Sequence, residues 1–149
     1  DLHSFPTRRS SDLHIDYGLP AAHLYHPQRI QGTLRCHFRH TAHDDPFANV
    51  GLQDITAWVD FTAVAHAAVN ARLDVLGFTT QAAFLLGTGI ESLLADADVD
   101  LRTRVARSGE AQRLLLPGQM GEAFKAIALG RGYDRALSGF SVRDLRDSL

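Results

Sequence analysis

The sequence predicts an α/β fold, in which helices cover the faces of a sheet. Three apolar segments with extended character, 14–18, 73–80 and 124–129, are each bounded by glycine or other turn-forming residues, as strands usually are. An extended segment at 54–60, an alanine-rich helical pattern at 62–71 and the strand at 73–80 follow one another directly. This order of strand, helix and strand has the spacing expected of an α/β layer.

The first thirteen residues, 1–13 (DLHSFPTRRSSDL), resemble the translation of a widely used short-read sequencing adapter. We therefore keep them out of the fold reasoning, as one does with a fusion scar. The alternative is a natural arm rich in serine and arginine. On the adapter interpretation, the strand at 14–18 begins without a cap or leader, and we expect the chain to be a fragment of a longer gene product with an exposed sheet edge at this strand.

A long insertion, 19–52, follows the first strand. Within it, 33–41 alternates apolar and polar side chains with a period of two, which predicts a half-buried strand or ribbon. The segment 54–60 alternates in the same way and predicts one further extended stretch. Loops of this length inside a compact domain are usually functional or disordered, so the insertion is a candidate partner-binding element.

Helices account for much of the remaining chain. Asp60 is placed to cap the first turn of the helix that follows it. The pattern at 81–97 has helical periodicity, but Gly87 and Gly89 weaken its middle and predict a bent or two-part helix. A further helix is expected at 101–115, before a Pro-Gly pair.

Composition excludes several classes of protein. With 45% hydrophobic and 21% charged residues the chain has the composition of a globular domain, and its net charge of −2 leaves no basic field to attract nucleic acid or an anionic membrane. No apolar run is long enough to predict a membrane span. The single cysteine, Cys36, cannot form an internal disulfide, so a reducing, cytoplasmic compartment is expected.

The end of the first strand is the strongest candidate binding position. In open α/β sheets, ligands bind beyond the carboxyl ends of the strands, where the tripeptide of Asp16, Tyr17 and Gly18 lies. A carboxylate can accept hydrogen bonds from a polar ligand and a tyrosine ring offers a flat apolar face. The alternative is a turn with a solvated aspartate and a packed tyrosine. Asp54 is a second candidate acid or base, because it begins a strand beside a loop.

A histidine cluster provides an alternative hypothesis, a metal site. The string HFRHTAHDD holds His37, His40 and His43 with Asp44 and Asp45, and imidazole and carboxylate are ligands for zinc and non-haem iron. On a continuous strand His37 and His43 would share a face and His40 would point the other way. This spacing argues against a preformed site and favours a polar rim on the insertion.

Six strings, taken in order, carry a resemblance to a known family. They are IDYG, YHPQRIQGTL, HFRHTAHDDP, GLQDITAWVDF, GFTTQAAFLL and LLLPGQMGEAFKAIALGRG, which together cover essentially residues 14–140. They resemble the MidA-like family of class I S-adenosylmethionine-dependent methyltransferases, which is related to the mitochondrial complex I assembly arginine methyltransferase.

The resemblance implies the C-terminal part of a Rossmann-like class I methyltransferase sheet with a long insertion and helices on its faces. Segments 14–18, 73–80 and 124–129 would hold its fifth, sixth and seventh strands, the last two forming a reversed hairpin at the edge. The glycine-rich turn that holds the methyl donor, S-adenosyl-L-methionine, and the acidic residue that holds its ribose are missing from this chain. We therefore expect 14–149 to be inactive alone, although the intact parent would be an enzyme.

The activity implied is methylation of an arginine on a partner protein, such as a respiratory complex I subunit or another assembly client. Such a reaction needs groups that orient a guanidinium and accept a proton. The candidate catalytic residues are Asp16, His26, Asp54 and Thr56.

Two further points concern the site and its setting. Tyr17 and Gly18 are candidates for contact with the cofactor. Trp58 stands where relatives tend to carry histidine, so no role of that histidine carries over. The resemblance implies a cytoplasmic location for a bacterial protein and a mitochondrial one for eukaryotic relatives. A non-catalytic assembly or binding module of the same fold is the alternative function.

Overall fold

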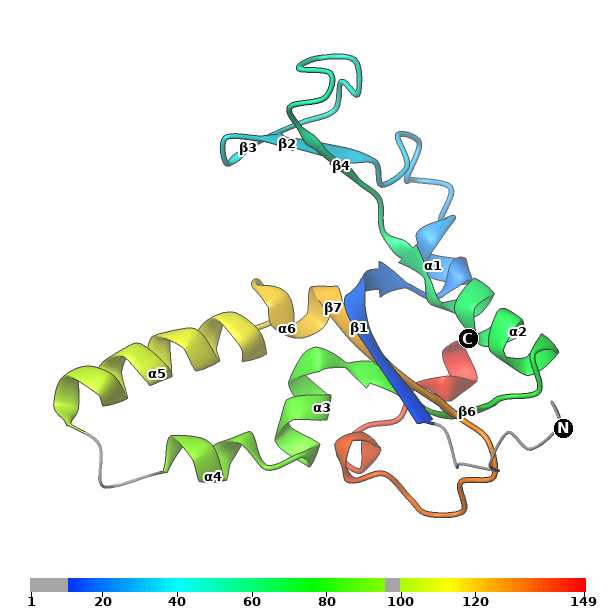
Figure 1. Cartoon of the computed structure of the whole chain (residues 1–149), viewed down its shortest axis with the longest axis vertical. Helices are drawn as coiled ribbons and strands as arrows, with labels where there is room; N and C mark the ends of the chain where they lie inside the picture. The colour runs from blue at the N-terminus through cyan, green and yellow to red at the C-terminus, as the bar shows by residue number, and fades with distance from the viewer. Residues whose placement is uncertain (1–10, 96–99) are drawn as a thin grey trace, which may run out of the picture.

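The computed structural model describes residues 11–95 and 100–149, and its centre is a four-stranded sheet (Figure 1). The strand order is β5-β1-β7-β6, and β7 runs antiparallel to both of its neighbours. The strands are β1 (Ser11–Leu19), β5 (Val59–Asp60), β6 (Asp74–Thr80) and β7 (Phe124–Gly130). The α/β fold class is confirmed, and so is the expected pairing of 73–80 with 124–129 in a reversed arrangement at the sheet's edge.

The central strand β7 is buried on both faces, and each face carries its own core. Ile127 and Leu129 pack with Phe61 and Phe78, whose ring centroids are 5.2 Å apart. This face is covered by α2 (Phe61–Asn70), and Asp60 caps that helix as predicted by accepting a hydrogen bond from the Ala63 amide at 3.0 Å. A strand buried on both faces has to be an almost continuous apolar run, and β7 is one.

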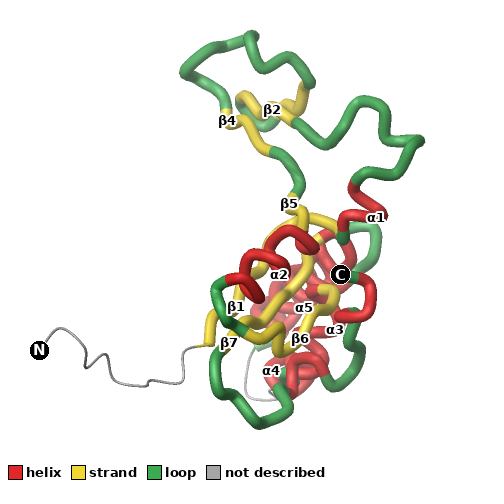
Figure 2. The backbone as a smooth tube through the Cα atoms, turned by 90° about the vertical axis from the view of Figure 1, so that its right-hand side faces the viewer, coloured by secondary structure: helices red, strands yellow, loops and turns green. Residues whose placement is uncertain are grey.

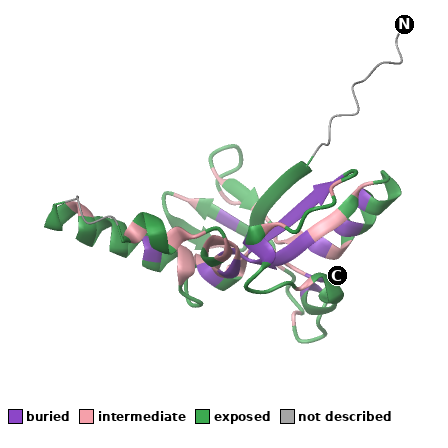
Figure 3. Cartoon of the chain, turned by 90° about the horizontal axis from the view of Figure 1, so that it is seen from below, coloured by how far each residue is buried: buried purple, intermediate pink, exposed green. Residues whose placement is uncertain are grey.

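The opposite face of β7 presents two alanines, Ala126 and Ala128, which pack with Phe140. Phe140 belongs to the short 3₁₀ helix η1 (Ser138–Phe140), and its ring meets that of Phe84 at 5.4 Å. A second 3₁₀ helix, η2 (Arg146–Ser148), lies against β6 at the end of the chain. Figure 3 shows the buried residues concentrated on the central strands.

Of the helices after β6, α3 packs against the sheet, and α4 and α5 extend from it as an arm (Figure 1). The predicted break in 81–97 is confirmed: α3 (Gln81–Gly87) is separated from α4 (Ile90–Leu94) by Gly89, whose φ of 85° is in the left-handed region that favours glycine. The predicted helix 101–115 is α5 (Leu101–Leu115). Sequence reasoning missed the short α6 (Met120–Ala123). No helix in the described ranges is both long and apolar enough to span a bilayer.

The insertion and the strand that follows it form a separate small sheet that stands off the main one (Figure 2). After α1 (Ala21–Leu24), it has the order β3-β2-β4, with β2 (Arg35–Phe38), β3 (Thr41–His43) and β4 (Asp54–Thr56). Of the strand or ribbon predicted over 33–41, the structure shows the ribbon: Arg39 and His40 take φ values of 47° and 65° and turn the chain back, so that β2 and β3 pair antiparallel. The prediction of a single extended segment at 54–60 is wrong, since this stretch holds two strands, β4 and β5, that belong to different sheets.

Strand β1 is longer than expected and has an open edge. Ser11 pairs with Gly130 and Leu13 with Ala128, so three of the residues assigned to the adapter belong to the ladder, while 1–10 lie outside the described residues. Backbone hydrogen bonds form whatever the side chains are, and the adapter origin of 1–13 stays a prediction. Away from β7, only Gly18 and Leu19 pair, with β5, so within the described chain 11–17 present an exposed strand edge.

A pair of glycine substitutions tests the packing around β7. A Cβ added at Gly77 would lie 2.3 Å from Cγ of the buried Phe140, so Gly77→Ala should lower the free energy of unfolding by about 1–3 kcal/mol. Gly109 lies within α5 with open space around it, and Gly109→Ala should raise that free energy by up to about 1 kcal/mol. Urea unfolding followed by circular dichroism measures both. A Gly77→Ala variant as stable as the original chain would contradict the packing described.

Candidate functional site

A cavity of about 410 Å³ lies between the small sheet and the carboxyl end of β1. Its lining side chains come from β1, from the loop before β2, and from β2, β4 and the residues after β4. They are Tyr17, Thr33, Arg35, His37, Asp54, Thr56 and Trp58. The position agrees with the expectation that a ligand site opens beyond the carboxyl end of the first strand.

Tyr17 joins the two sheets at this cavity. Its hydroxyl shares a short hydrogen bond with Oγ1 of Thr56, and its ring meets the edge of Phe124 at a centroid distance of 5.4 Å. The Tyr17 ring is therefore held by the first residue of β7 on one side and by β4 on the other. A tyrosine fixed at both ends offers a rigid flat surface, because little rotamer freedom remains to be lost on binding.

The register of the small sheet explains why its polar side chains line the cavity together. Arg35 lies opposite Thr56, and His37 lies opposite Asp54. Side chains alternate between the faces of a strand, so these four share one face while Cys36 points to the other, where it is fully buried. The pairing brings the imidazole of His37 and the carboxylate of Asp54 to neighbouring positions at the cavity. Sequence reasoning missed this pair, because its formation depends on how the small sheet folds.

Trp58 forms the apolar wall of the cavity. Its backbone amide donates to Oγ1 of Thr33 at 3.1 Å, and Cζ of Arg29 lies 5.0 Å from its ring centroid. A guanidinium over an indole is a cation–π contact, and indole is the aromatic group that binds cations best. In the sequence Trp58 stood out only as a departure from relatives, so its place in the site was not predicted.

The four candidate catalytic residues do not form one cluster. Asp54 and Thr56 lie together at the cavity beside Tyr17, as just described. Asp16 lies on the face of β1 opposite to Tyr17, across the ladder from Lys125. Its Oδ1 accepts a hydrogen bond from the Tyr17 backbone amide at 2.8 Å. His26 lines a separate hollow near α1.

Gly18 has a packing role. A Cβ at this position would lie 2.3 Å from the Val59 carbonyl oxygen and 2.8 Å from the Phe61 ring. Only glycine therefore lets β5 and the start of α2 approach β1 this closely. Contact of Gly18 or Tyr17 with a cofactor stays a prediction.

The histidines of the insertion do not gather. His43 pairs with Cys36, so it lies on the face of the small sheet opposite to His37, and His40 lies in the turn between them. The expectation that His37 and His43 share a face was wrong, because the hairpin reverses the chain between them. Among the described residues no group of three histidine, cysteine or acidic side chains is arranged to hold a metal.

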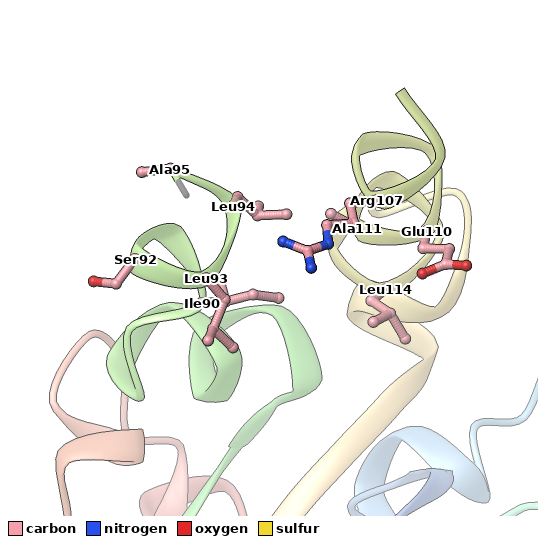
Figure 4. Close-up of a pocket in the computed structure, with 9 residues that line it drawn as sticks. All are labelled: Ile90, Ser92, Leu93, Leu94, Ala95, Arg107, Glu110, Ala111 and Leu114. Carbon is pink, nitrogen blue, oxygen red and sulfur yellow. The ribbon is translucent and has the colours of Figure 1, made fainter. Parts of the chain in front are cut away.

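A larger hollow of about 750 Å³ lies on the helical arm, between α4 and α5 (Figure 4). Its lining is largely apolar, with Leu94 on α4 facing Ala111 and Leu114 on α5, while Arg107 points across from α5 toward α4. It holds one basic and one acidic side chain, Arg107 and Glu110, but no aromatic ring or imidazole, so we place the candidate site at the carboxyl end of β1.

Lys125, the only lysine of the chain, is nearly buried at the start of β7. Its Nζ donates a short hydrogen bond to the Glu122 carbonyl oxygen. Burial lowers the pKa of Lys125; the negative charge of Glu122 opposes this effect and the positive charge of Arg143 adds to it. The lysine is thus a poorly solvated cation placed directly across the ladder from Asp16 and Thr80.

Comparison with known proteins gives a family match and two close structures. Residues 7–79 match the family model described as "Putative S-adenosyl-L-methionine-dependent methyltransferase". A Burkholderia thailandensis structure described as a "likely methyl transferase" bound to S-adenosyl-homocysteine is 48% identical, with a TM-score of 0.91 over 93% of this chain. A native structure of an uncharacterized member of the same superfamily, from the same organism, is also 48% identical, with a TM-score of 0.92 over 95% of this chain.

This chain covers 36% and 38% of those two structures. No curated protein matches it.

The buried lysine predicts a pH dependence of stability. Because the folded-state pKa of Lys125 is below the unfolded value of 10.5, the unfolded chain binds more protons between the two values, and stability should rise with pH across that window. Lys125→Met should remove this rise, whereas Arg135→Met, at an exposed cation, should keep it. Urea unfolding from neutral pH to about pH 10 measures the difference. Parallel pH profiles for the original chain and Lys125→Met would contradict the assignment.

Proposed function

Because residues 7–79 match the model of S-adenosyl-L-methionine-dependent methyltransferases, we propose that this chain is part of such an enzyme. The observation that carries the proposal is the cavity at the carboxyl end of β1, where a carboxylate, an imidazole and two aromatic rings meet. The similar structure bound to S-adenosyl-homocysteine, the product left by the methyl donor, supports S-adenosyl-L-methionine as the cofactor.

The side chains of this cavity fit the methyl-accepting side of the reaction. The donor supplies an activated methyl group on a sulfonium sulphur. What the described residues contribute is a carboxylate at Asp54, an imidazole at His37 and the flat faces of Tyr17 and Trp58, which suit a cationic or nitrogen-bearing acceptor. We further propose that residues 14–149 form the C-terminal part of the catalytic domain, and that the turn that binds the methyl donor lies elsewhere in the intact protein.

The acceptor we propose is an arginine side chain of a partner protein. Arg29 supports this, because it shows that the Trp58 ring accommodates a guanidinium at 5.0 Å. A carboxylate at Asp54 can pair with a second guanidinium through charge-assisted hydrogen bonds and so orient one nitrogen. As that nitrogen bonds to the methyl carbon and the carbon–sulphur bond breaks, Asp54 accepts the proton that the nitrogen loses, and the electron pair of the broken bond stays on sulphur.

The MidA-like resemblance supports the narrower identity of the partner. We propose a respiratory complex I subunit or another assembly client as the protein substrate, and a cytoplasmic location in a bacterial source. Asp16 and His26 lie outside the cavity, so on this proposal neither contacts the reacting nitrogen.

Asp54→Asn in the intact protein tests the proposed base. The amide keeps the shape of the side chain but cannot accept the proton, so the rate of methyl transfer to an arginine peptide should fall by about 10²–10⁴-fold. Asp74→Asn is the matched control, because it removes an exposed carboxylate at the amino end of β6, at the opposite edge of the sheet from the cavity. Transfer of label from the methyl donor measures both rates. Equal activity of Asp54→Asn and the original protein would exclude Asp54 as the base, and absence of transfer by the original protein to any arginine substrate would remove the arginine proposal.

A second candidate function, partner docking by the insertion, is favoured by its exposed apolar side chains. Phe47, Val50 and Leu52 lie on the loop between β3 and β4 with exposed fractions of 84%, 74% and 72%. This loop is at the far end of the small sheet, away from the main sheet (Figure 2). An exposed apolar patch on a projecting element marks a protein-binding surface.

The double variant Phe47→Ser with Leu52→Ser separates docking from catalysis. In the intact protein it should raise KM for a folded protein substrate by at least about tenfold, since full burial of one such side chain contributes about 1.5–3 kcal/mol and each 1.4 kcal/mol is a factor of ten, while KM for a short arginine peptide stays unchanged. Val142→Ser, at another exposed apolar position, is the control. An equal rise in KM for peptide and protein would show that the loop serves the catalytic cavity instead.

A further inference from the structure

A second hollow, of about 550 Å³, lies beside the candidate site and is lined by Leu19, His23, His26, Gln28 and Arg29. Three of these five side chains carry nitrogen donors that are cationic or can become so, and none of the five is acidic. Arg29 is shared between the two places, since it lines this hollow and stacks on Trp58 of the first cavity. The hollow at the carboxyl end of β1 is therefore lined by nitrogen donors and by no carboxylate.

Arg29 contacts Trp58 and has one N–H donor, on Nε, that makes no hydrogen bond within the described residues. Its guanidinium carbon lies over the Trp58 ring, 5.0 Å from the ring centroid, and its Nε is buried. Buried donors in proteins are nearly always paired, so an unpaired one indicates a group supplied from outside the chain. An arginine fork matches the oxygens of a carboxylate or phosphate.

His26 adds a second donor. Its Nδ1 accepts a hydrogen bond from the Gln28 amide at 3.3 Å, which requires the neutral ring to carry its proton on Nε2. Nε2–H is then available to an acceptor whether the ring is neutral or charged. His23, in the last turn of α1, brings a further imidazole to the same hollow.

We propose that the hollow lined by His23, His26 and Arg29 binds an oxyanion, the carboxylate or phosphate group of a ligand. The anion accepts from Arg29 and from His26 Nε2, and Leu19 supplies the apolar wall. The site is distinct from the cavity that holds Asp54, and the proposal does not depend on methyl transfer. Because Arg29 contacts both places, an anion bound here changes the surroundings of the Trp58 ring.

Trp58 is the only tryptophan, so its fluorescence reports on the site directly. The experiment has two arms: inorganic phosphate is titrated into the 149-residue chain in the first, and succinate in the second. Both are run at fixed pH and at an ionic strength held constant with sodium chloride. We expect a saturable change of Trp58 emission and of the His26 ring resonances, and the arm with the tighter binding identifies the phosphate or the carboxylate as the natural group. No change in either reporter in either arm overturns the proposal.

Variants identify the donors. His26→Gln leaves the Arg29–Trp58 stack intact and should weaken binding about tenfold, the usual value of one charge-assisted hydrogen bond. Arg29→Gln should weaken binding more, measured through the His26 resonances because the Trp58 surroundings change. Arg135→Gln, at an exposed cation on the loop after β7, should bind as the original chain does. Equal weakening by Arg135→Gln and His26→Gln would show general charge attraction and overturn the proposal.

Discussion

The burial of β7 on both faces is the constraint on which the rest of this structure depends. Its position between β1 and β6, antiparallel to each, requires a strand that packs against two different layers at once. The sequence meets this requirement with large residues, Ile127 and Leu129, toward α2 and small ones, Ala126 and Ala128, toward the Phe140 ring. A large side chain in place of either alanine would push η1 away, because interiors are close-packed and do not absorb extra volume.

The candidate site is a consequence of the same strand. Phe124, at the start of β7, meets the edge of Tyr17 at the carboxyl end of β1, and Tyr17 in turn bonds to Thr56 of the small sheet. The position of the insertion over the main sheet is thus fixed by a chain of contacts that begins at β7. The register of β2 against β4 then places Arg35, His37 and Asp54 on the face of the small sheet that lines the cavity.

Much of the fold was predictable from local patterns, and the site was predictable only in part. The strand at 124–129, the helix at 101–115 and the break between α3 and α4 follow from apolar periodicity and from glycine, which act over a few residues. Tyr17 and Asp54 were selected because they lie at the ends of predicted strands, and Thr56 was selected only with the family resemblance; the structure brings the three together.

What the sequence could not predict depends on contacts between segments distant in the chain or on backbone conformations that are unusual for the residues concerned. The reversal at Arg39 and His40 uses positive φ values at two residues that rarely adopt them, so the period-two pattern continued through the turn and concealed it. That concealed turn also decides the faces of His37 and His43. The cross-strand pairing of His37 with Asp54, the stacking of Arg29 on Trp58 and the burial of Lys125 all arise from tertiary packing.

The tryptophan at position 58 has a chemical consequence for the proposed reaction. A histidine there would offer a ring that gains and loses a proton near neutral pH, whereas indole offers a flat face and one N–H and cannot act as a base. Any proton accepted in this cavity must therefore go to Asp54 or His37, which the register of the small sheet places opposite each other. The indole instead strengthens the binding of a cation, as its contact with Arg29 shows. Compared with a histidine, the indole therefore suits this wall of the cavity to recognition, and the proposed proton transfer is left to side chains on the neighbouring strands.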